Sequence, residues 1–334
     1  MVMEVTRSTN INSTTKQQEK IPVTIITGFL GSGKTTLVNH ILQEQHGRKI
    51  AVIVNEFGEI GIDGQITIAD DREQIVEFNN GCLCCTVRGD LVRTLENLSQ
   101  RELDAVLIET TGLADPAPVA STFIVADEIK SKFSLDAFVT VIDARNLSQN
   151  IKDSHEAQEQ VAFADILLIN KIDLVTSDEI VKIEQQVRSL NPIAKIYHTE
   201  YGSIDLSLIL GTKAFELEAK LEIDPSFLED LEHEHDAAIG SFAVTSDRPI
   251  DLNKFMFWMN DLAQAKGEDL YRTKGLFYAQ GFPERVLFQS VRMLTSMRRD
   301  RLWKQDEPKL TQLVAIGRNL DREEFVKGFE KCVV

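Results

Sequence analysis

The sequence contains no apolar run that approaches the roughly 18 residues a membrane-spanning helix requires. Its first 20 residues also lack an apolar core, because they are polar and rich in Ser, Thr, Asn and Gln. This composition differs from that of a secretory signal, and we interpret residues 1–20 as a disordered tail. The sequence therefore predicts a cytoplasmic protein without a membrane partner.

Positive charge is also scarce. The 334 residues contain 36 Lys and Arg against 52 Asp and Glu, which gives a formal net charge of -16. A general nucleic-acid binder needs a basic face to neutralise phosphates, so the charge argues against this class of function. Hydrophobic residues make up 43% of the chain and charged residues 26%, which is ordinary for a globular protein long enough for two domains.

Cysteine is rare, and its distribution is uneven. Three of the four cysteines fall within residues 82–85, which read Cys-Leu-Cys-Cys. A chain of this length with one such cluster does not have the spacing of a disulfide framework. The cluster instead favours metal binding or redox chemistry.

Residues 28–36 read GFLGSGKTT and fit the phosphate-binding pattern G-x-x-x-x-G-K-[ST]. A β-branched run at residues 23–27 precedes them and predicts a buried strand, whereas apolar residues at helical spacing follow them over 37–42. Between a strand and a helix, glycines let backbone N–H groups point at phosphate oxygens. The predicted nucleotide contacts come from Gly31, Ser32, Gly33, Lys34, Thr35 and Thr36.

The residue types in this loop assign separate roles. We predict that Lys34 reaches the β- and γ-phosphates and that the Thr35 hydroxyl ligates Mg²⁺. The pattern therefore predicts a protein that binds a nucleoside triphosphate. A chance Gly-rich turn is the alternative, and the strand–loop–helix setting argues against it.

Strands and helices alternate over residues 21–210. Apolar strands are predicted at 49–54, 75–78, 104–109, 138–143, 166–169 and 194–197, with a helix at 177–190. This alternation predicts an α/β fold of the P-loop NTPase type, with a mostly parallel sheet covered by helices on both faces. Ligands of such sheets bind at the carboxyl ends of the strands.

Two acidic residues, one in a loop and one at a strand end, are candidates for positioning Mg²⁺ or water. Residues 55–64 contain three glycines and three carboxylates, including Asp63, and this composition is typical of a mobile switch loop that holds a cation near the nucleotide. A solvated acidic turn is the alternative. Glu109 ends the strand 104–109 and is followed by Thr-Thr-Gly. We predict that Asp63 or Glu109 positions Mg²⁺ or the attacking water.

Residues 170–173 read Asn-Lys-Ile-Asp at the end of a predicted strand. The Asp173 carboxylate can accept two hydrogen bonds from guanine, and adenine offers neither donor at that edge. Asn170 can meet the base edge, and the Lys171 stem can lie along the ring plane. The sequence therefore predicts GTP; an ATP-dependent kinase or a non-hydrolysing nucleotide sensor is the rival interpretation.

The remainder predicts a linker and a second domain. Residues 211–238 are acidic and contain His233 and His235, which suit a solvated turn or a transient metal-loading segment. Residues 239–334 predict a smaller α+β domain with the order β-α-β-β-β-α. The basic island of Arg298, Arg299 and Arg301 is interpreted as a solvated face.

Taken together, these motifs resemble the CobW-like family of P-loop GTPases and metallochaperones. The resemblance covers residues 21–332. It is carried by residues 28–36, the Asn-Glu-Phe-Gly loop at 55–58, Gly-Cys-Leu-Cys-Cys at 81–85, Glu-Thr-Thr-Gly at 109–112, Asn-Lys-Ile-Asp at 170–173 and three segments of the second domain at 272–275, 288–291 and 316–320. One departure is Arg292, where many members carry His, so no metal role transfers to that position.

The resemblance implies a slow, Mg²⁺-dependent GTPase that delivers zinc, or cobalt in the cobalamin branch, to a target metalloprotein. We expect a monomer or a weak homo-oligomer. The zinc ligands would be Cys82, Cys84 and Cys85, with Glu59 of the switch loop as the implied fourth ligand. Two alternatives stay open for the cysteines, namely a redox pair of Cys82 and Cys84 or three buried unreactive thiols.

Overall fold

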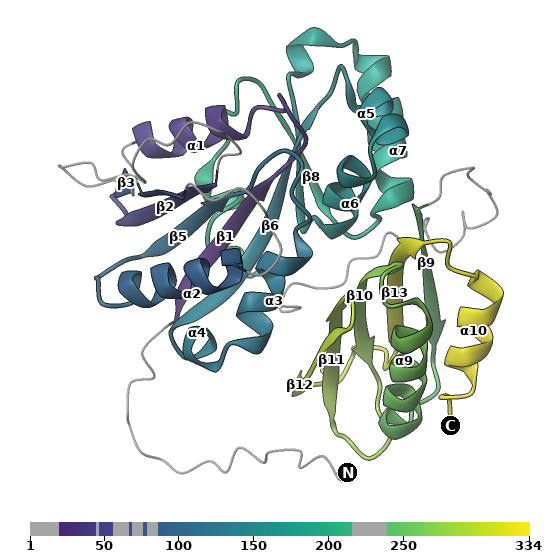
Figure 1. The fold of residues 1–334 in the computed structure, drawn as a ribbon. Helices are drawn as coiled ribbons and strands as arrows, with labels where there is room; N and C mark the ends of the chain where they lie inside the picture. The colour runs from purple at the N-terminus through teal and green to yellow at the C-terminus, as the bar shows by residue number, and fades with distance from the viewer. Residues whose placement is uncertain (1–19, 45–46, 56–66, 69–75, 79–85, 216–238) are drawn as a thin grey trace.

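The computed structural model describes residues 20–44, 47–55, 67–68, 76–78, 86–215 and 239–334. The predicted switch loop, the cysteine cluster and most of the acidic linker lie outside these residues. Within them the chain forms two sheets, one in each half of the molecule (Figure 1).

The first sheet is mostly parallel and has the strand order β3-β2-β5-β1-β6-β7-β8, with β4 also paired to β2. Every pair is parallel except β2 with β3. Its strands are β1 (Ile21–Thr27), β2 (Ile50–Asn55), β3 (Thr67–Ile68), β4 (Val76–Phe78), β5 (Ala105–Glu109), β6 (Phe133–Asp143), β7 (Ile166–Asn170) and β8 (Lys195–Thr199).

Helices cover both faces of this sheet, because apolar side chains alternate between the faces along each strand. On one face Ile26 and its neighbours pack against Leu37 and Ile41 of α1, whereas on the other Val23 and Ile25 belong to the core that the remaining helices bury. The helices are α1 (Lys34–Gln43), α2 (Thr86–Leu98), α3 (Ala117–Val125), α4 (Asp127–Lys132), α5 (Leu147–Asp153), α6 (His155–Phe163) and α7 (Ser177–Leu190), with short 3₁₀ turns η1 (Ile172–Leu174) and η2 (Leu206–Leu208). The predicted α/β fold is confirmed.

The second sheet is antiparallel, with the order β12-β11-β10-β13-β9. Its elements are β9 (Ile239–Ser246), α9 (Leu252–Lys266), β10 (Leu270–Phe277), β11 (Glu284–Val291), β12 (Leu294–Leu302), β13 (Thr311–Arg318) and α10 (Arg322–Glu330). The sequence-based order β-α-β-β-β-α is therefore wrong by one strand, because β12 runs through the basic island. Charged side chains are typical of such an edge strand and hide its strand pattern.

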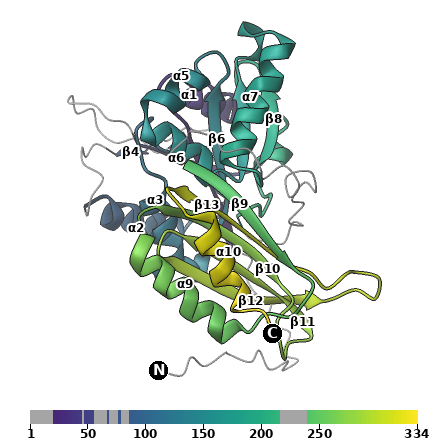
Figure 2. The same ribbon diagram turned by 90° about the vertical axis from the view of Figure 1, so that its right-hand side faces the viewer.

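The two halves pack together through one face of the second sheet, whose other face is covered by α9 and α10 (Figures 1 and 2). Tyr271, Val291 and Ile316 belong to the same buried core as the helices of the first half. At the centre of this interface the buried Asp165 accepts hydrogen bonds from Arg272 Nη2 at 2.5 Å and Lys274 Nζ at 2.8 Å. The buried carboxylate is thus paired with two cations from the second sheet.

Residues 211–215, the start of the predicted linker, pack on the first sheet. Asp136 of β6 accepts hydrogen bonds from the backbone N–H groups of Gly211 and Lys213, and its own carbonyl oxygen accepts one from the Phe215 N–H. The Phe215 side chain is buried and lies under the Arg272 guanidinium, 5.1 Å from ring centroid to Cζ. This stretch therefore helps to build the floor of the interface.

Candidate functional site

The phosphate loop follows β1 at the carboxyl edge of the first sheet. Gly28, Gly31 and Gly33 have φ values of 142°, 72° and 108°, in the left-handed region that favours glycine. A Cβ on Gly28 would lie 2.2 Å from the carbonyl oxygen of Val141, and one on Gly33 would lie 2.4 Å from the Asn170 side chain. The close approaches at Gly28 and Gly33 leave no room for a side chain there, which fits a loop that cradles phosphates.

Lys34 begins α1 and turns back into the loop. Its Nζ donates to the carbonyl oxygens of Gly28 at 2.8 Å and Phe29 at 3.1 Å. Burial lowers the pKa of Lys34, and the nearby Glu109 carboxylate opposes that effect. The buried Ser32 hydroxyl beside it has no hydrogen-bond partner among the described residues. Together a cation and an available hydroxyl provide the chemistry that a polyphosphate needs.

Thr35 and Glu109 meet beside the loop, although they lie 74 positions apart in the sequence. The Thr35 hydroxyl donates to Glu109 Oε1 at 2.8 Å, and the Glu109 side chain is buried. Hydroxyl and carboxylate oxygens are the hard ligands that Mg²⁺ prefers. These two predicted magnesium ligands therefore share one site, and their donor set fits the ion. Thr36 follows on the exposed side of α1.

The predicted base-binding residues follow β7, and Asn170 is buried there. Asn170 Nδ2 donates to the carbonyl oxygen of Ser32 at 3.0 Å, while its Oδ1 accepts from Thr199 Oγ1 at 3.0 Å and from the Gly202 N–H at 3.1 Å. Asn170 thus ties the phosphate loop to the turn after β8. Its contact with a base edge stays a prediction.

Lys171 and Asp173 lie on the more exposed side of the same strand end. Lys171 has a φ of 63°, and its Nζ donates to the carbonyl oxygen of Gly31 and to Asp143 Oδ2, both at 2.7 Å. Asp173 lies exposed in the 3₁₀ turn η1, where its carboxylate is accessible to a ligand. The structure therefore places the phosphate loop and the Asn-Lys-Ile-Asp segment side by side.

Sequence reasoning missed Asp143, which ends β6 beside Lys171. Its carboxylate also accepts hydrogen bonds from the backbone N–H groups of Arg145 and Asn146. Burial raises the pKa of Asp143, but the Lys171 and Asn146 contacts lower it below the ordinary value. Asp143 therefore remains an anion that holds Lys171 against the phosphate loop.

Thr199, which ends β8, and Gly202 in the turn after it were also missed. Both donate to Asn170, and a Cβ on Gly202 would lie 2.9 Å from Leu37 Cα at the start of α1. The position of Asp143, Thr199 and Gly202 at or after the end of a parallel strand was the available signal, since ligands bind at that edge.

The segment after Glu109 connects the loop to more distant parts of the fold. A Cβ on Gly112 would lie 2.8 Å from the Leu30 backbone nitrogen, so this segment packs directly on the phosphate loop. The buried Gln160 of α6 donates to the carbonyl oxygens of Gly112 at 3.0 Å and Ala114 at 3.3 Å. Gln160 therefore fixes the course of the backbone beyond Glu109.

Several predicted site residues lie outside the described residues. They are Asp63 and Glu59 of the switch loop, Cys82, Cys84 and Cys85 of the cysteine cluster, and His233 and His235 of the linker. In the described ranges, no group of three or more His, Cys, Asp or Glu side chains is placed to hold a metal ion. Nor does that part of the chain contain a helix long and apolar enough to cross a membrane.

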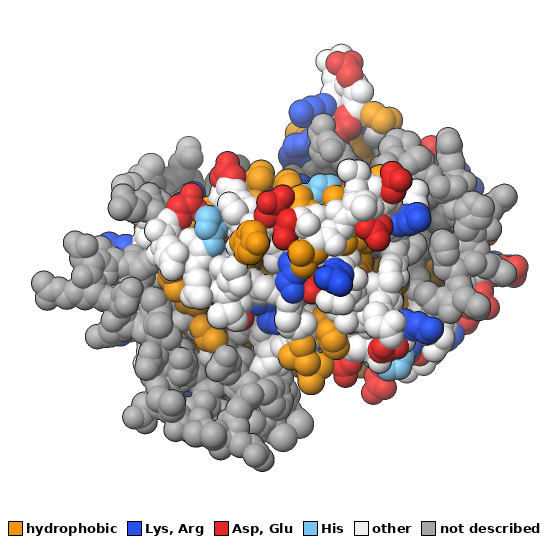
Figure 3. All heavy atoms as spheres, turned by 90° about the horizontal axis from the view of Figure 1, so that it is seen from above, with side chains coloured by type: hydrophobic (Ala, Val, Ile, Leu, Met, Phe, Trp, Pro, Cys, Tyr) orange, Lys and Arg blue, Asp and Glu red, His pale blue; other side chains and the backbone are white. Residues whose placement is uncertain are grey.

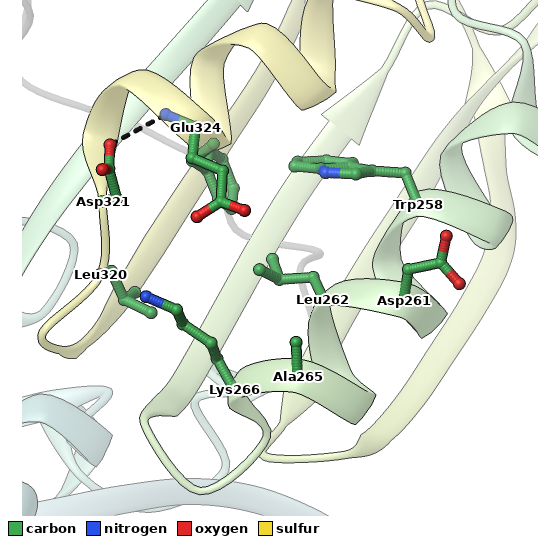
Figure 4. A pocket seen from close by; sticks show the side chains of 9 residues that line it. Trp258, Asp261, Leu262, Ala265, Lys266, Leu320, Asp321 and Glu324 are labelled. Atoms are coloured by element: carbon green, nitrogen blue, oxygen red, sulfur yellow. Dashed lines mark hydrogen bonds between the residues drawn. The ribbon is translucent and has the colours of Figure 1, made fainter.

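The described surface is mixed in charge, and one of its hollows lies in the C-terminal half. On the end of the molecule seen in Figure 3, the described basic side chains form small groups among acidic and hydrophobic ones. A hollow of about 220 Å³ lies between α9 and α10 of the second half (Figure 4). Trp258 and Leu262 line it from α9 and Glu324 from α10, and it contains none of the predicted site residues.

Comparison with known proteins finds matches for both halves. The family model described as the CobW/HypB/UreG nucleotide-binding domain matches residues 22–198, and that of the cobalamin synthesis protein cobW C-terminal domain matches residues 239–333. The zinc chaperone YjiA of Escherichia coli is 38% identical over 92% of this chain and 98% of its own. The zinc-regulated GTPase metalloprotein activator 1 of Schizosaccharomyces pombe is 33% identical over 93% of this chain and 85% of its own.

Solved structures agree with these matches. The crystal structure of the Zn(II)-bound YjiA GTPase from E. coli has a TM-score of 0.76 and 36% identity, and covers 95% of this chain and all of that one. A Zn(II)-bound triple mutant of the YjiA GTPase, in which one glutamate and two cysteines are replaced by alanine, has a TM-score of 0.77 and 35% identity over the same shares.

The phosphate loop, the Thr35–Glu109 pair and the segment that begins at Asn170 thus occur in a fold shared with a GTPase along nearly the whole chain. The chain belongs to the CobW/HypB/UreG family of P-loop GTPases and carries the CobW C-terminal domain.

Proposed function

We propose that this GTPase is a metallochaperone: it binds zinc through Cys82, Cys84 and Cys85 and delivers the ion to a target metalloprotein under nucleotide control. The relatives named zinc chaperone and zinc-regulated metalloprotein activator support the metal, because each aligns with over nine-tenths of this chain. Zinc is the cargo here, and cobalt is the second choice for the same thiolate ligands.

The register of three neighbouring strands supports the nucleotide control. β2 pairs in parallel with both β4 and β5, with Asn55 opposite Phe78 and Val54 opposite Glu109. β2, β4 and β5 therefore end side by side at their carboxyl ends, beside Glu109. The chain continues from Asn55 into the predicted switch loop and from Phe78 into the segment that contains the cysteine cluster. A change at the nucleotide can reach both segments from there, by the order–disorder route of GTPase switches.

Each group of the nucleotide site has a proposed role. Lys34 binds the phosphates, Asp173 selects guanine, and Thr35 with Glu109 or Asp63 holds Mg²⁺, which neutralises phosphate charge when it is bound. Glu109 can instead orient the attacking water, because its buried carboxylate lies beside the phosphate loop. We expect slow intrinsic hydrolysis.

The cysteines and Glu59 have the chemistry of an exchangeable zinc site. Zn²⁺ favours four tetrahedral ligands and binds thiolates well, so three cysteines leave one position for a carboxylate such as Glu59 or for a ligand of the receiving protein. An incomplete thiolate shell suits a protein that hands its metal on. A closed four-cysteine shell would suit a structural role instead.

A zinc titration against a chromophoric chelator tests this proposal in the GDP form and in the form bound to a non-hydrolysable GTP analogue. We expect one zinc ion bound per chain, with different affinity in the two nucleotide forms, and a large loss of affinity in Cys84→Ser. Cys332→Ser is the matched control, because Cys332 is a buried cysteine of the C-terminal half, and it should bind zinc as the unmodified protein does. Thiol counting on the same samples detects a Cys82–Cys84 disulfide.

Affinity is the necessary measurement, because zinc in a crystal does not identify its ligands. The YjiA triple mutant without one glutamate and two cysteines also gave a Zn(II)-bound crystal structure. If the reduced protein bound no zinc in either nucleotide form, or if Cys84→Ser bound it unchanged, metal delivery would be ruled out and the GTPase activity would remain.

A further inference from the structure

Arg292 joins the two halves of the molecule from a tight turn. It lies between β11 and β12, and its φ of 49° is a left-handed conformation that a non-glycine residue keeps only when its surroundings hold it there. Its guanidinium packs over the ring of Tyr271 at 5.2 Å and donates to the carbonyl oxygen of Glu268 at 2.6 Å. Contacts within its own domain therefore hold the side chain in place.

The same guanidinium reaches two carboxylates of the nucleotide-binding half. Arg292 Nη2 lies 3.0 Å from Asp115 Oδ2 and 3.4 Å from Glu159 Oε1. The Glu159 side chain is only 14% exposed; burial and the neighbouring Asp115 raise its pKa, and Arg292 opposes that change. The positive charge of Arg292 therefore offsets the repulsion between these two carboxylates. The lowest-energy position of its guanidinium depends on where both carboxylates lie.

Asp115 ends the segment that begins at the nucleotide site. Glu109 starts this segment with its contact to Thr35, and Gly112 packs against Leu30 of the phosphate loop. Glu159 precedes Gln160 on α6, whose side chain donates to the carbonyl oxygens of Gly112 and Ala114 in the same segment, so Asp115 moves relative to Glu159 only if these two hydrogen bonds rearrange. The short segment 109–115 thus connects the phosphate loop to the C-terminal domain.

We propose that Arg292 couples the nucleotide site to the C-terminal domain: a shift of the segment 109–115 between the GDP and GTP forms moves Asp115 relative to Glu159, and the β11–β12 hairpin responds through Arg292. The physical requirement is a contact that differs between the two nucleotide forms, and the guanidinium shared by Asp115 and Glu159 would be such a contact once Asp115 moves. This coupling goes beyond metal delivery and does not depend on the zinc site.

Hydrogen exchange of the full chain tests the coupling. The backbone amides of β11 and β12 are followed with GDP bound and with a non-hydrolysable GTP analogue bound. We expect their exchange rates to differ by about fivefold or more between the two forms, the lower end of usual allosteric coupling. Arg292→Ala should remove most of this difference, and Arg292→Lys, which keeps the charge but loses the two-pronged geometry, should restore part of it.

A second variant and a control make the result decisive. Asp115→Asn should remove the difference as Arg292→Ala does, and the double variant should add nothing further; Asp115→Asn also decides the question if Arg292→Ala fails to fold. Arg248→Ala is the control, because its Nε donates to the Val334 carbonyl oxygen within the C-terminal domain, and it should retain the full difference. Equal exchange in both nucleotide forms of the unmodified protein, or a full difference in Asp115→Asn and Arg292→Ala, would overturn the proposal.

Discussion

The side-chain amide of Asn170 donates to the carbonyl oxygen of Ser32 at 3.0 Å, across 138 positions of sequence. Asn170 belongs to the Asn-Lys-Ile-Asp segment, which we propose binds the base. Through this hydrogen bond it also contacts the loop around Ser32, which we propose binds the phosphates. Through Asn170 Oδ1 the turn at Gly202 joins the same assembly. The Asn170 amide, together with the hydrogen bond from Lys171 Nζ to the carbonyl oxygen of Gly31, thus fixes the distance between the two elements.

Asn170→Ala should therefore weaken both folding and nucleotide binding. The substitution leaves the buried N–H of Gly202 without its acceptor, which we expect to cost about 1–3 kcal/mol in the free energy of unfolding. Urea unfolding and GTP titration measure the two effects. Asn39→Ala on the exposed side of α1 is the control and should change neither. Unchanged GTP affinity in Asn170→Ala would contradict the linking role.

Lys34→Met should separate binding from stability. The variant loses the charge-assisted hydrogen bonds to phosphate, each worth about 1.5–3 kcal/mol, so GTP affinity should fall steeply. The free energy of unfolding should change little, because burial already disfavours the charged ammonium and lowers its pKa. Isothermal titration and chemical unfolding check this, with the exposed Lys195→Met as control. A large loss of stability would show that Lys34 is structural.

Glu109→Gln should lower the rate of GTP hydrolysis more than GTP affinity. The amide oxygen can still accept the Thr35 hydrogen bond, so the loop is retained while the negative charge is lost. We expect turnover to fall by about 100-fold, as for loss of a positioned acid–base group. Repeating the rate measurement over a Mg²⁺ series separates the two roles, because excess Mg²⁺ rescues a weakened ligand but not a missing water-positioning group. Glu96→Gln, exposed on α2, should behave normally.

The interface at Asp165 predicts an unusual pH dependence. Burial, together with Arg272, lowers the pKa of Lys274 to about 8, and Asp165 opposes them, whereas the ordinary lysine value is 10.5. Between these values the unfolded chain holds a proton that the folded chain has released. Stability must rise with pH wherever the unfolded state binds more protons, so Lys274 should add stability as pH increases from about 8 to about 10.

Comparing the unmodified protein with Lys274→Met isolates this contribution, because other titrating groups are common to both. The difference in free energy of unfolding should shift in favour of the unmodified protein as the pH rises. Urea unfolding at several pH values in this window gives the measurement. Parallel pH profiles for the two proteins would mean that Lys274 titrates normally despite its burial.

Local sequence patterns predicted the first sheet well because most of its strands are short apolar runs with a polar residue or glycine after them. The predicted helix 177–190 matches α7, and the structure shows a capping box of Thr176 and Glu179 at its start. β12 was missed because Arg298, Arg299 and Arg301 interrupt any apolar alternation. It pairs with β11 across the two-residue turn at 292–293, which contains neither Gly nor Asn to signal a hairpin.

Only those residues of the candidate site that belong to a recognisable sequence motif could be predicted. Thr35, Glu109 and Asn170 stand in recognisable patterns, but the contacts among them span long sequence separations and emerge only in the folded chain. Arg272, Lys274 and Arg292 gave no signal of their contacts, because an ion pair between domains looks like any surface charge in sequence. The roles of Asp63, Glu59, Cys82, Cys84 and Cys85 stay predictions.

The arginines of β12 also bear on how the protein behaves at high concentration. β12 forms an outer edge of the second sheet, where unpaired backbone groups invite another strand to add. Arg298, Arg299 and Arg301 are exposed along it, and a second copy approaching this edge would bring three more. Mutual repulsion should discourage sheet-to-sheet growth even in a chain whose overall charge is strongly negative.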